Sequence, residues 1–170
     1  LATAQADAST AEDALYTLDV SGNFADVDVG DTLSYTATGM PSTMTMSTAG
    51  VLSGTPLDAD VGSHTVVVTA TDGTASITDT FDVTVTNTND APAVSSTAVT
   101  AATEDSAYSY SITSTDDDSD SSDAWAITCA TCPSWLSVTD AGDGTATLAG
   151  TPLNADVGDN SVVITVTDTA

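Results

Sequence analysis

Oxygen-bearing side chains are concentrated in a short stretch near the middle of the chain, TNTNDAP at residues 86–92. Asn87 and Asn89 stand at alternate positions, and Asp90 follows directly. In an extended backbone alternate side chains point to the same side, so their oxygens can converge with nearby carbonyls on one hard cation. The stretch therefore predicts a segment that binds Ca²⁺ rather than a flexible linker.

Acidic side chains recur with matching spacing in two other stretches, FADVDVGD at residues 24–31 and DDDSDSSD at residues 116–123. The matching acids are Asp26, Asp28 and Asp31 in the first stretch and Asp118, Asp120 and Asp123 in the second. This spacing places two carboxylates on one side of an extended segment and returns a third at the turn, and a bound cation relieves their repulsion. Each acid taken alone also fits a solvated turn or an Asx cap, and that alternative stays open.

The charge of the whole chain restricts its partners. Among 170 residues there are 25 acidic side chains, no Lys or Arg and one His, which gives a formal charge of −25. Nucleic acid is excluded as a natural partner, and an anionic membrane surface is disfavoured, because binding to either requires cationic side chains. Bound divalent metal, high salt or solvation can each screen such a charge. Of these three ways to screen the charge, only metal binding predicts that the acidic side chains should cluster at particular places.

Composition and patterning indicate a folded, secreted chain. Hydrophobic residues make up 41% of the sequence, and Val and Thr alternate in regular segments, which argues against disorder. No run approaches the roughly 20 apolar residues that a membrane-spanning helix needs. Residues 1–10 lack the basic, apolar and cleavage regions of a signal peptide. We therefore expect an internal piece of a longer extracellular protein, with no membrane insertion.

An internal repeat divides the chain. The nine residues EDALYTLDV at 12–20 return 92 positions later as EDSAYSYSI at 104–112. The nine residues GTPLDADVG at 54–62 return 96 positions later as GTPLNADVG at 150–158. The second copy has therefore gained four residues, which we place in the loop at residues 140–145.

Short alternating segments separated by Gly, Asp and Pro predict strands in both copies, and no window has a helical apolar period. The predicted strands are residues 14–20, 32–38, 43–47, 51–54, 63–71 and 77–86 in the first copy, and 107–114, 124–128, 135–138, 145–150 and 161–167 in the second. Their spacing is typical of a β-sandwich. The chain is therefore predicted to be all-β, with one domain at residues 1–90 and another at residues 91–170.

The second copy lacks a counterpart of the last strand of the first. The apolar alternation of SITDTFDVTVT at residues 76–86 is not repeated after the second copy. A sandwich without this strand has an open edge and an uncovered apolar groove. Three explanations stay open: an artificial chain boundary, a strand supplied by residues 1–11, or a strand donated by a neighbouring molecule. The boundary is favoured, because LATAQADASTA at residues 1–11 lacks the alternation.

Three stretches of the first copy, FADVDVGDTLSYTATG, VLSGTP and VTATDGTASITDTFDVTVTNTNDAP, together resemble the dystroglycan-type cadherin-like domain of bacterial surface and secreted proteins. The resemblance covers residues 11–92 and 103–168. It implies two tandem Ig/cadherin-like β-sandwich domains, the second without its last strand. It also implies that Ca²⁺ is held between successive domains.

The residues that match the family's calcium ligands lie in both copies. The resemblance implies one interdomain site with these ligands: Glu12, Asp72, Asn87, Asn89, Asp90, Asp118 and Asp120. It implies that Asp26 and Asp28 are calcium ligands in the first domain, where the site would be incomplete. The linker has fewer acids than is usual in cadherins, and Gly73 follows Asp72 where an acid-x-acid motif is usual. We therefore expect fewer or weaker Ca²⁺ ions than in a full cadherin junction.

Cys129 and Cys132 form the motif CATC in the second copy. In a cytosolic protein such a pair would indicate redox chemistry or half of a zinc site, but the sequence has neither a second Cys pair nor a nearby His. In an extracellular protein the pair predicts a disulfide that closes the turn before Pro133.

No feature of the sequence indicates catalysis. The chain has a single His, His64, no phosphate-binding loop, and no Lys or Arg to stabilise an oxyanion. We expect a calcium-stabilised structural repeat of an extracellular adhesin, stalk or filament, which acts as a rigid spacer or assembly module and whose partners are neighbouring repeats or copies of itself. One alternative is a carbohydrate-binding module that stacks glycans on Trp135 or Tyr110. Another is a filament subunit that assembles by β-strand donation.

Overall fold

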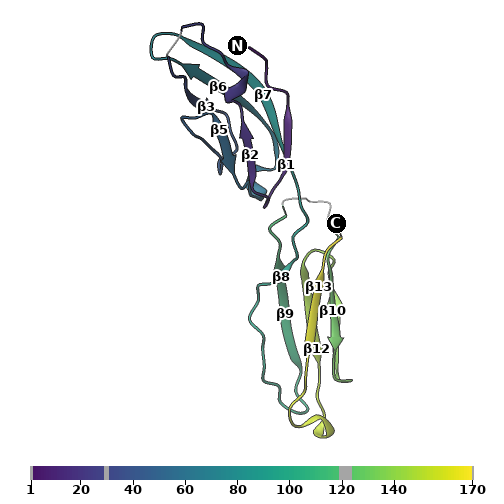
Figure 1. Ribbon diagram of the computed structural model, residues 1–170. Coiled ribbons are helices and arrows are strands. Elements are labelled where there is room, and N and C mark those ends of the chain that lie inside the picture. Colours follow the sequence, from purple (N-terminus) through teal and green to yellow (C-terminus); the bar gives the residue numbers. More distant parts are fainter. Residues whose placement is uncertain (1, 29–30, 119–123, 170) are drawn as a thin grey trace. The chain divides into compact units, whose positions relative to one another are not determined.

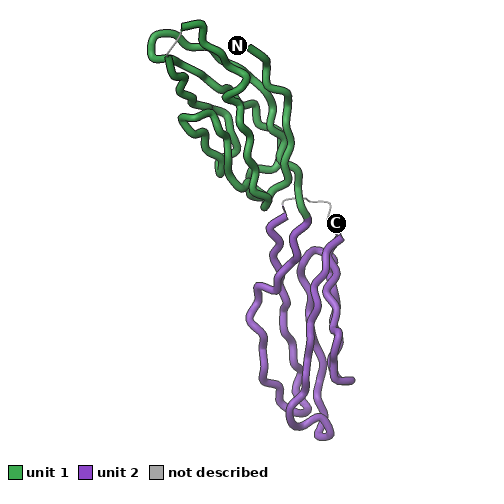
Figure 2. Tube along the Cα trace, viewed as in Figure 1, with its two compact units in different colours: residues 1–88 green, residues 89–170 purple. Residues whose placement is uncertain are grey.

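The computed structural model describes residues 2–28, 31–118 and 124–169 (Figure 1). The chain divides into two compact units, Leu1–Thr88 and Asn89–Ala170, coloured green and purple in Figure 2. Within the described ranges, the only helical elements are three 3-10 turns of three residues each, at Ser21–Asn23, Asp58–Asp60 and Asn154–Asp156. The prediction of an all-β chain is therefore confirmed.

Unit 1 is built from two sheets. The four-stranded sheet has the order β1 (Ala8–Ala11), β7 (Ser76–Thr86), β6 (Gly62–Thr71) and β3 (Ser34–Thr38). The three-stranded sheet has the order β2 (Tyr16–Asp19), β5 (Val51–Gly54) and β4 (Thr45–Met46). Strand β1 runs parallel to β7, and every other pair in this unit is antiparallel.

The core of unit 1 follows from the period of two along its longest strands. On β6, Val66 and Val68 are fully buried, and on β7, Phe81, Val83 and Val85 are at most 3% exposed. Residues between them, such as the Thr residues of β7, face outward, because successive side chains of a strand point to opposite faces. Burying each of these apolar side chains contributes about 1.5–3 kcal/mol.

Unit 2 repeats part of this arrangement. One sheet has the order β11 (Leu136–Asp140), β12 (Thr145–Gly150), β9 (Tyr108–Thr115) and β8 (Ala93–Val94), and the other pairs β10 (Ala126–Thr131) with β13 (Val163–Thr167). Its core contains Tyr110, Ile112, Ile127, Ala146 and Leu148. Unit 2 therefore has fewer fully buried apolar side chains than unit 1.

The registers of the two units locate the four extra residues of the second copy. Tyr16 pairs with Gly54 in unit 1, and Tyr108 pairs with Gly150 in unit 2. The hairpin of β4 and β5 has two residue pairs, whereas that of β11 and β12 has five. The insertion thus lengthens the second hairpin, as predicted for residues 140–145.

Each predicted strand overlaps an observed one, but β1 and β8 were not predicted.

Strand β13 has a partner on one side only, within the part of the chain that the structure describes. In unit 1 the corresponding strand, β6, lies between β3 and β7. In unit 2 strand β13 pairs with β10, the counterpart of β3, and no described residue occupies the place of β7. Accordingly Val66 is fully buried, while its counterpart Val162 is 37% exposed. The prediction that the second sandwich lacks its last strand is confirmed for these residues.

Candidate metal centre

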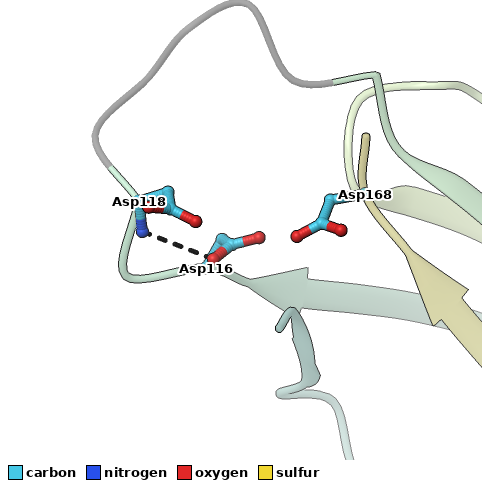
Figure 3. A group of neighbouring side chains, drawn as sticks. All are labelled: Asp116, Asp118 and Asp168. Atoms are coloured by element: carbon cyan, nitrogen blue, oxygen red, sulfur yellow. Dashed lines mark hydrogen bonds between the residues drawn. The ribbon is translucent and has the colours of Figure 1, made fainter. Parts of the chain in front are cut away.

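Three carboxylates meet at one end of unit 2. Asp116 directly follows β9, Asp168 directly follows β13, and Asp118 lies in the loop after β9. One carboxylate oxygen from each lies within 4.8 Å of one from each of the others, and all three side chains are half-buried (Figure 3). Oxygens bound to one Ca²⁺ lie about 2.3–2.6 Å from the ion, so two of them can be up to about 5 Å apart. The spacing therefore fits a single Ca²⁺.

The environment of Asp116 favours a cation. Its Oδ1 accepts a hydrogen bond from the Asp118 backbone N–H, with a donor–acceptor distance of 3.3 Å. Its Oδ2 is buried and has no hydrogen-bond partner among the described residues. A buried carboxylate oxygen without a partner costs free energy. A metal ion would supply the missing interaction, which no Lys or Arg of this chain can do.

The first residues of unit 2 contact the same carboxylates. The Asn89 side-chain amide donates to Asp168 Oδ2 at 3.1 Å, and the Asp90 backbone N–H donates to Asp118 Oδ2 at 2.6 Å. The structure thus brings together three of the predicted ligands, Asn89, Asp90 and Asp118. An ion bound here would hold the start of unit 2 against the ends of β9 and β13.

Sequence reasoning missed two of the carboxylates and named one that lies outside the described residues. Asp168 is the counterpart of Asp72, 96 positions later, and this repeat could have identified it. Asp116 was within the acidic stretch at residues 116–123, but its counterpart in the first copy is Phe24, so the repeat gave no signal for it. Asp120 lies outside the described residues.

Unit 1 contains a partial counterpart of this centre. Asp72 Oδ1 accepts hydrogen bonds from the Ala75 and Thr74 backbone N–H groups at 2.7 and 2.6 Å. These bonds, with a smaller contribution from the Asp26 side chain, lower the pKa of Asp72. Asp26 itself accepts from the Asp28 backbone N–H at 2.9 Å. Because Phe24 is 7% exposed and packs in the core where unit 2 has Asp116, this end of unit 1 offers one carboxylate fewer.

Glu12 and Asn87 lie at the other end of unit 1 from Asp72. Glu12 is 2% exposed, and its Oε1 accepts from the Thr88 backbone N–H at 2.8 Å. Asp72 follows β6 in the turn that leads to Ser76, the first residue of β7, whereas Asn87 follows the last. The 11 residues of β7 span roughly 30 Å. The expected grouping of Asp72 with Glu12 and Asn87 in one site is therefore wrong.

A second buried acid has a structural role. Asp60 is 2% exposed and accepts hydrogen bonds from Thr43 Oγ1, Ser42 Oγ and the backbone N–H of Ser42 at 2.6–2.8 Å. Burial alone would raise its pKa, but these bonds, with one from the Leu57 backbone N–H, outweigh burial and lower the pKa to about 2. The Nε2 atom of His64, the only His, lies 2.7 Å from the Asp60 carbonyl oxygen. His64 therefore belongs to a packed turn.

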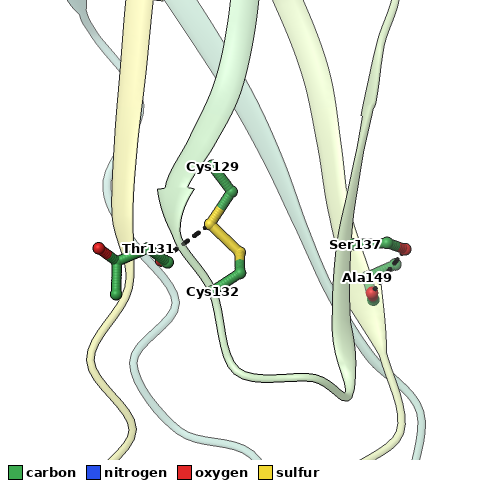
Figure 4. Close-up of a disulfide and its surroundings, with 5 residues drawn as sticks. All are labelled: Cys129, Thr131, Cys132, Ser137 and Ala149. Carbon is green, nitrogen blue, oxygen red and sulfur yellow. Dashed lines mark hydrogen bonds between the residues drawn. A yellow bond between two sulfur atoms is a disulfide. The ribbon is translucent and has the colours of Figure 1, made fainter.

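The cysteine pair and the large aromatic residues of unit 2 also have local packing partners. A disulfide joins Cys129 and Cys132, with Cα atoms 5.8 Å apart (Figure 4). Trp135 packs edge-on against Tyr108, with ring centroids 5.8 Å apart. Tyr110 is 7% exposed, and its hydroxyl lies 2.7 Å from Ser96 Oγ. Tyr110 is therefore largely buried, whereas Trp135 is half-buried beside Tyr108.

Comparison with solved structures supports the fold. The PcdhgB3 EC1-4 structure has a TM-score of 0.63 and 16% identity, covering 96% of this chain and 44% of that one. The human Desmocollin-1 ectodomain has a TM-score of 0.51 and 18% identity, covering 84% of this chain and 28% of that one. An endo-fucoidan hydrolase of glycoside hydrolase family 107 has 26% identity but a TM-score of 0.43, covering 98% of this chain and 27% of that one. The chain thus spans less than half the length of each.

Comparison with family models gives the relationship in sequence. No curated protein matches the chain. The He_PIG model, described as "Putative Ig domain", matches twice, at residues 1–86 and 91–170. With the cadherin ectodomain fold of the first two structures, this confirms the predicted pair of tandem Ig/cadherin-like β-sandwiches. The chain belongs to the He_PIG family of Ig-like domains and contains two of them in tandem.

Proposed function

We propose that the chain is a calcium-stabilised structural repeat of an extracellular protein, in which each unit serves as a rigid spacer between its neighbours. The observation that carries the proposal is the cluster of Asp116, Asp118 and Asp168, whose oxygens have the spacing of a Ca²⁺ site. An Ig-like fold with cadherin ectodomain neighbours is consistent with a structural or adhesive role.

Calcium would act on the segment that joins the repeats. Asn89 and Asp90 are hydrogen-bonded to Asp168 and Asp118, and Asn89 follows Thr88 of unit 1 directly in the chain. An ion that fixes these carboxylates also restrains residues 89–90. The binding free energy of the ion then becomes stability of unit 2 and stiffness of the joining segment.

An extracellular location agrees with the chemistry of the chain. The Cys129–Cys132 disulfide persists in oxidising surroundings. Sites of extracellular modules bind Ca²⁺ with Kd values of about 10⁻⁴–10⁻³ M, which suits a site with few ligands. No helix among the described residues has the length and apolar character needed to cross a bilayer. The partners would be neighbouring repeats of the same protein.

Catalysis and sugar binding are less well supported. Ig-like and cadherin-like domains are typically non-enzymatic, and the single His is engaged with the Asp60 carbonyl oxygen. Trp135 and Tyr110, the residues that a glycan would stack on, pack against Tyr108 and Ser96. We therefore propose that the chain is not an enzyme.

Thermal unfolding with and without calcium tests the proposal. At a Ca²⁺ concentration of ten to a hundred times Kd, binding adds about 1.4–2.7 kcal/mol, so the midpoint for unit 2 should rise by about 6–20 °C over that in chelator. The same concentration of Mg²⁺ should have a much smaller effect, because Mg²⁺ demands a stricter octahedral geometry and releases its water reluctantly. A midpoint that is the same in calcium and in chelator would contradict the proposal.

A further inference from the structure

An N–H group donates a hydrogen bond to each of the three clustered carboxylates. The Asp118 backbone N–H donates to Asp116 Oδ1 at 3.3 Å, drawn as a dashed line in Figure 3. The Asp90 backbone N–H donates to Asp118 Oδ2 at 2.6 Å, and the Asn89 side-chain Nδ2 donates to Asp168 Oδ2 at 3.1 Å. Because the chain has no Lys or Arg, neutral donors such as these offset part of the repulsion among the carboxylates before an ion arrives.

Asn89 is the donor of this set that belongs to a side chain. Its Nδ2 carries two hydrogens, and it donates to the Asp90 carbonyl oxygen at 3.0 Å as well as to Asp168 Oδ2 at 3.1 Å. With the amide group reversed, its oxygen would face a carbonyl oxygen and a carboxylate oxygen, and no hydrogen would lie between them. The two acceptors therefore fix which end of the Asn89 amide points toward Asp168.

Asp168 is the carboxylate of the cluster that most needs such a contact. Asp116 and Asp118 lie close together after β9 and are joined by their own hydrogen bond, whereas Asp168 comes from the end of β13 (Figure 3). Within the part of the chain that the structure describes, Asn89 is the donor to the Asp168 carboxylate. The Asn89 amide therefore directs the carboxylate that a separate strand contributes.

We propose that Asn89 is a positioning residue of the calcium centre, which holds Asp168 toward Asp116 and Asp118 by hydrogen bonding and is not itself a ligand. This role rests on the proposed function, because the position of Asp168 matters here only if the cluster binds Ca²⁺. The family resemblance implies the other role, direct ligation by Asn89. The two roles use opposite ends of the amide, since a cation is bound by the oxygen and a carboxylate by the NH₂ group.

Asn89→Asp separates the two roles, because it exchanges the NH₂ group for an oxygen at nearly constant size. If Asn89 were a ligand, the variant would keep a ligand oxygen and add a charge, and Ca²⁺ binding would become tighter. As a positioning residue it loses its donor and turns a carboxylate toward Asp168, so Ca²⁺ binding should weaken about three- to ten-fold. Calorimetric titration with Ca²⁺ measures the change. Binding as tight as that of the wild type, or tighter, would overturn the proposal.

Thr88→Asp is the control for added charge. It introduces the same negative charge one residue earlier, at an exposed position. Because an added negative charge attracts Ca²⁺ through space, this variant should bind Ca²⁺ no more weakly than the wild type. Equal weakening in Thr88→Asp and Asn89→Asp would show that the loss does not come from the amide donor, and would overturn the proposal.

Asn89→Ala tests whether the residue acts through Asp168. Alone it should weaken Ca²⁺ binding about three- to ten-fold, but in a chain that already carries Asp168→Asn it should cause a further loss of no more than about two-fold. NMR titration to tens of millimolar Ca²⁺ measures the weaker variants. Additive losses would show that Asn89 acts independently of Asp168 and would overturn the proposal.

Unfolding in chelator separates positioning from a merely structural role. The hydrogen bond between Asn89 and Asp168 is exposed, so the midpoint of Asn89→Ala in chelator should stay within about 4 °C of that of the wild type. A larger fall in this midpoint, with unchanged Ca²⁺ affinity, would make the role structural and overturn the proposal.

The same titrations distinguish the role of Asn89 from the calcium centre itself. A wild-type protein that does not bind Ca²⁺ at up to about 10 mM would overturn both. Tighter binding by Asn89→Asp, or additive losses with Asp168→Asn, would overturn the role of Asn89 alone and leave the calcium centre in place.

Discussion

At the scale of single residues, one of the three clustered carboxylates of unit 2 has no acidic counterpart in unit 1. Unit 2 has Asp116 where unit 1 has the buried Phe24, while the other two carboxylates have counterparts, Asp26 for Asp118 and Asp72 for Asp168. Three close carboxylates repel one another unless a cation lies between them. Unit 2 should therefore bind Ca²⁺ more tightly than the corresponding end of unit 1.

Asp168→Asn should weaken calcium binding by about ten- to a hundred-fold, because it removes one charged ligand from a site with few. Calorimetric titration with Ca²⁺ measures the change. Asp117→Asn is the matched control, since it removes the same charge from an exposed neighbour in the same loop that is not part of the cluster. Similar losses in the two variants would mean that general charge, and not ligation, attracts the ion.

Asp60→Asn should destabilise unit 1 near neutral pH by on the order of 2 kcal/mol, because the pKa of Asp60 is about 2 in the folded protein and an ordinary Asp has a pKa of 3.8. Because the pKa of Asp60 is lower in the folded than in the unfolded protein, the ionised carboxylate stabilises the fold. This stabilisation is fully present above pH 3.8 and is lost as the pH falls through about 2. Denaturant unfolding at several pH values should show the two proteins converging over that range. Asp31→Asn removes the same charge from an exposed position of the same unit and is the matched control.

At the scale of elements, the repeated GTP motif has a packing reason. A Cβ atom on Gly54 would lie 2.5 Å from the Thr43 carbonyl oxygen and 2.8 Å from Met44 Cα. A Cβ atom on Gly150 would overlap the Trp135 carbonyl oxygen in the same way. In both units the segment that leads into the preceding strand crosses this glycine closely, so no larger residue fits.

Gly54→Ala should lower the stability of unit 1 by about 1–3 kcal/mol, because the new methyl group can be accommodated only by moving backbone. Gly22→Ala is the control, since nothing lies within 4 Å of a Cβ at that position, and its effect should stay within about 0.5 kcal/mol. Urea unfolding of the two variants gives the comparison. A loss at Gly54 no larger than that at Gly22 would show that the segment can move away without cost.

Much of the fold could be predicted from local patterns, whereas the complete site could not. Val and Thr alternation located the long strands β6 and β7, but β1, with the sequence ASTA, carries no large apolar residue and is defined by its parallel pairing with β7. Asp118 was identified from its spacing. Asp168 joins it only because β9 and β13 end close together. Asp72 was misplaced because its role came from the family resemblance, although the strand predicted at residues 77–86 already separated it from Asn87.

At the scale of the whole molecule, the charge of −25 on a chain without Lys or Arg opposes compact folding. Monovalent salt screens this repulsion everywhere, but only a bound dication neutralises it at one place. The place where acids cluster in unit 2 is also the place where the chain enters that unit, through Asn89 and Asp90. Calcium would therefore convert local charge neutralisation into restraint of the segment between the repeats.

Residual dipolar couplings of the 170-residue protein, measured in chelator and in saturating Ca²⁺, test this account most directly. They report for each unit how it is aligned, and therefore whether the two move independently. In chelator the units should give different alignment tensors, and in Ca²⁺ they should give one shared tensor, a change that Asp168→Asn abolishes and Asp117→Asn does not. Tensors that remain different for the wild-type protein at saturating Ca²⁺ would contradict the account.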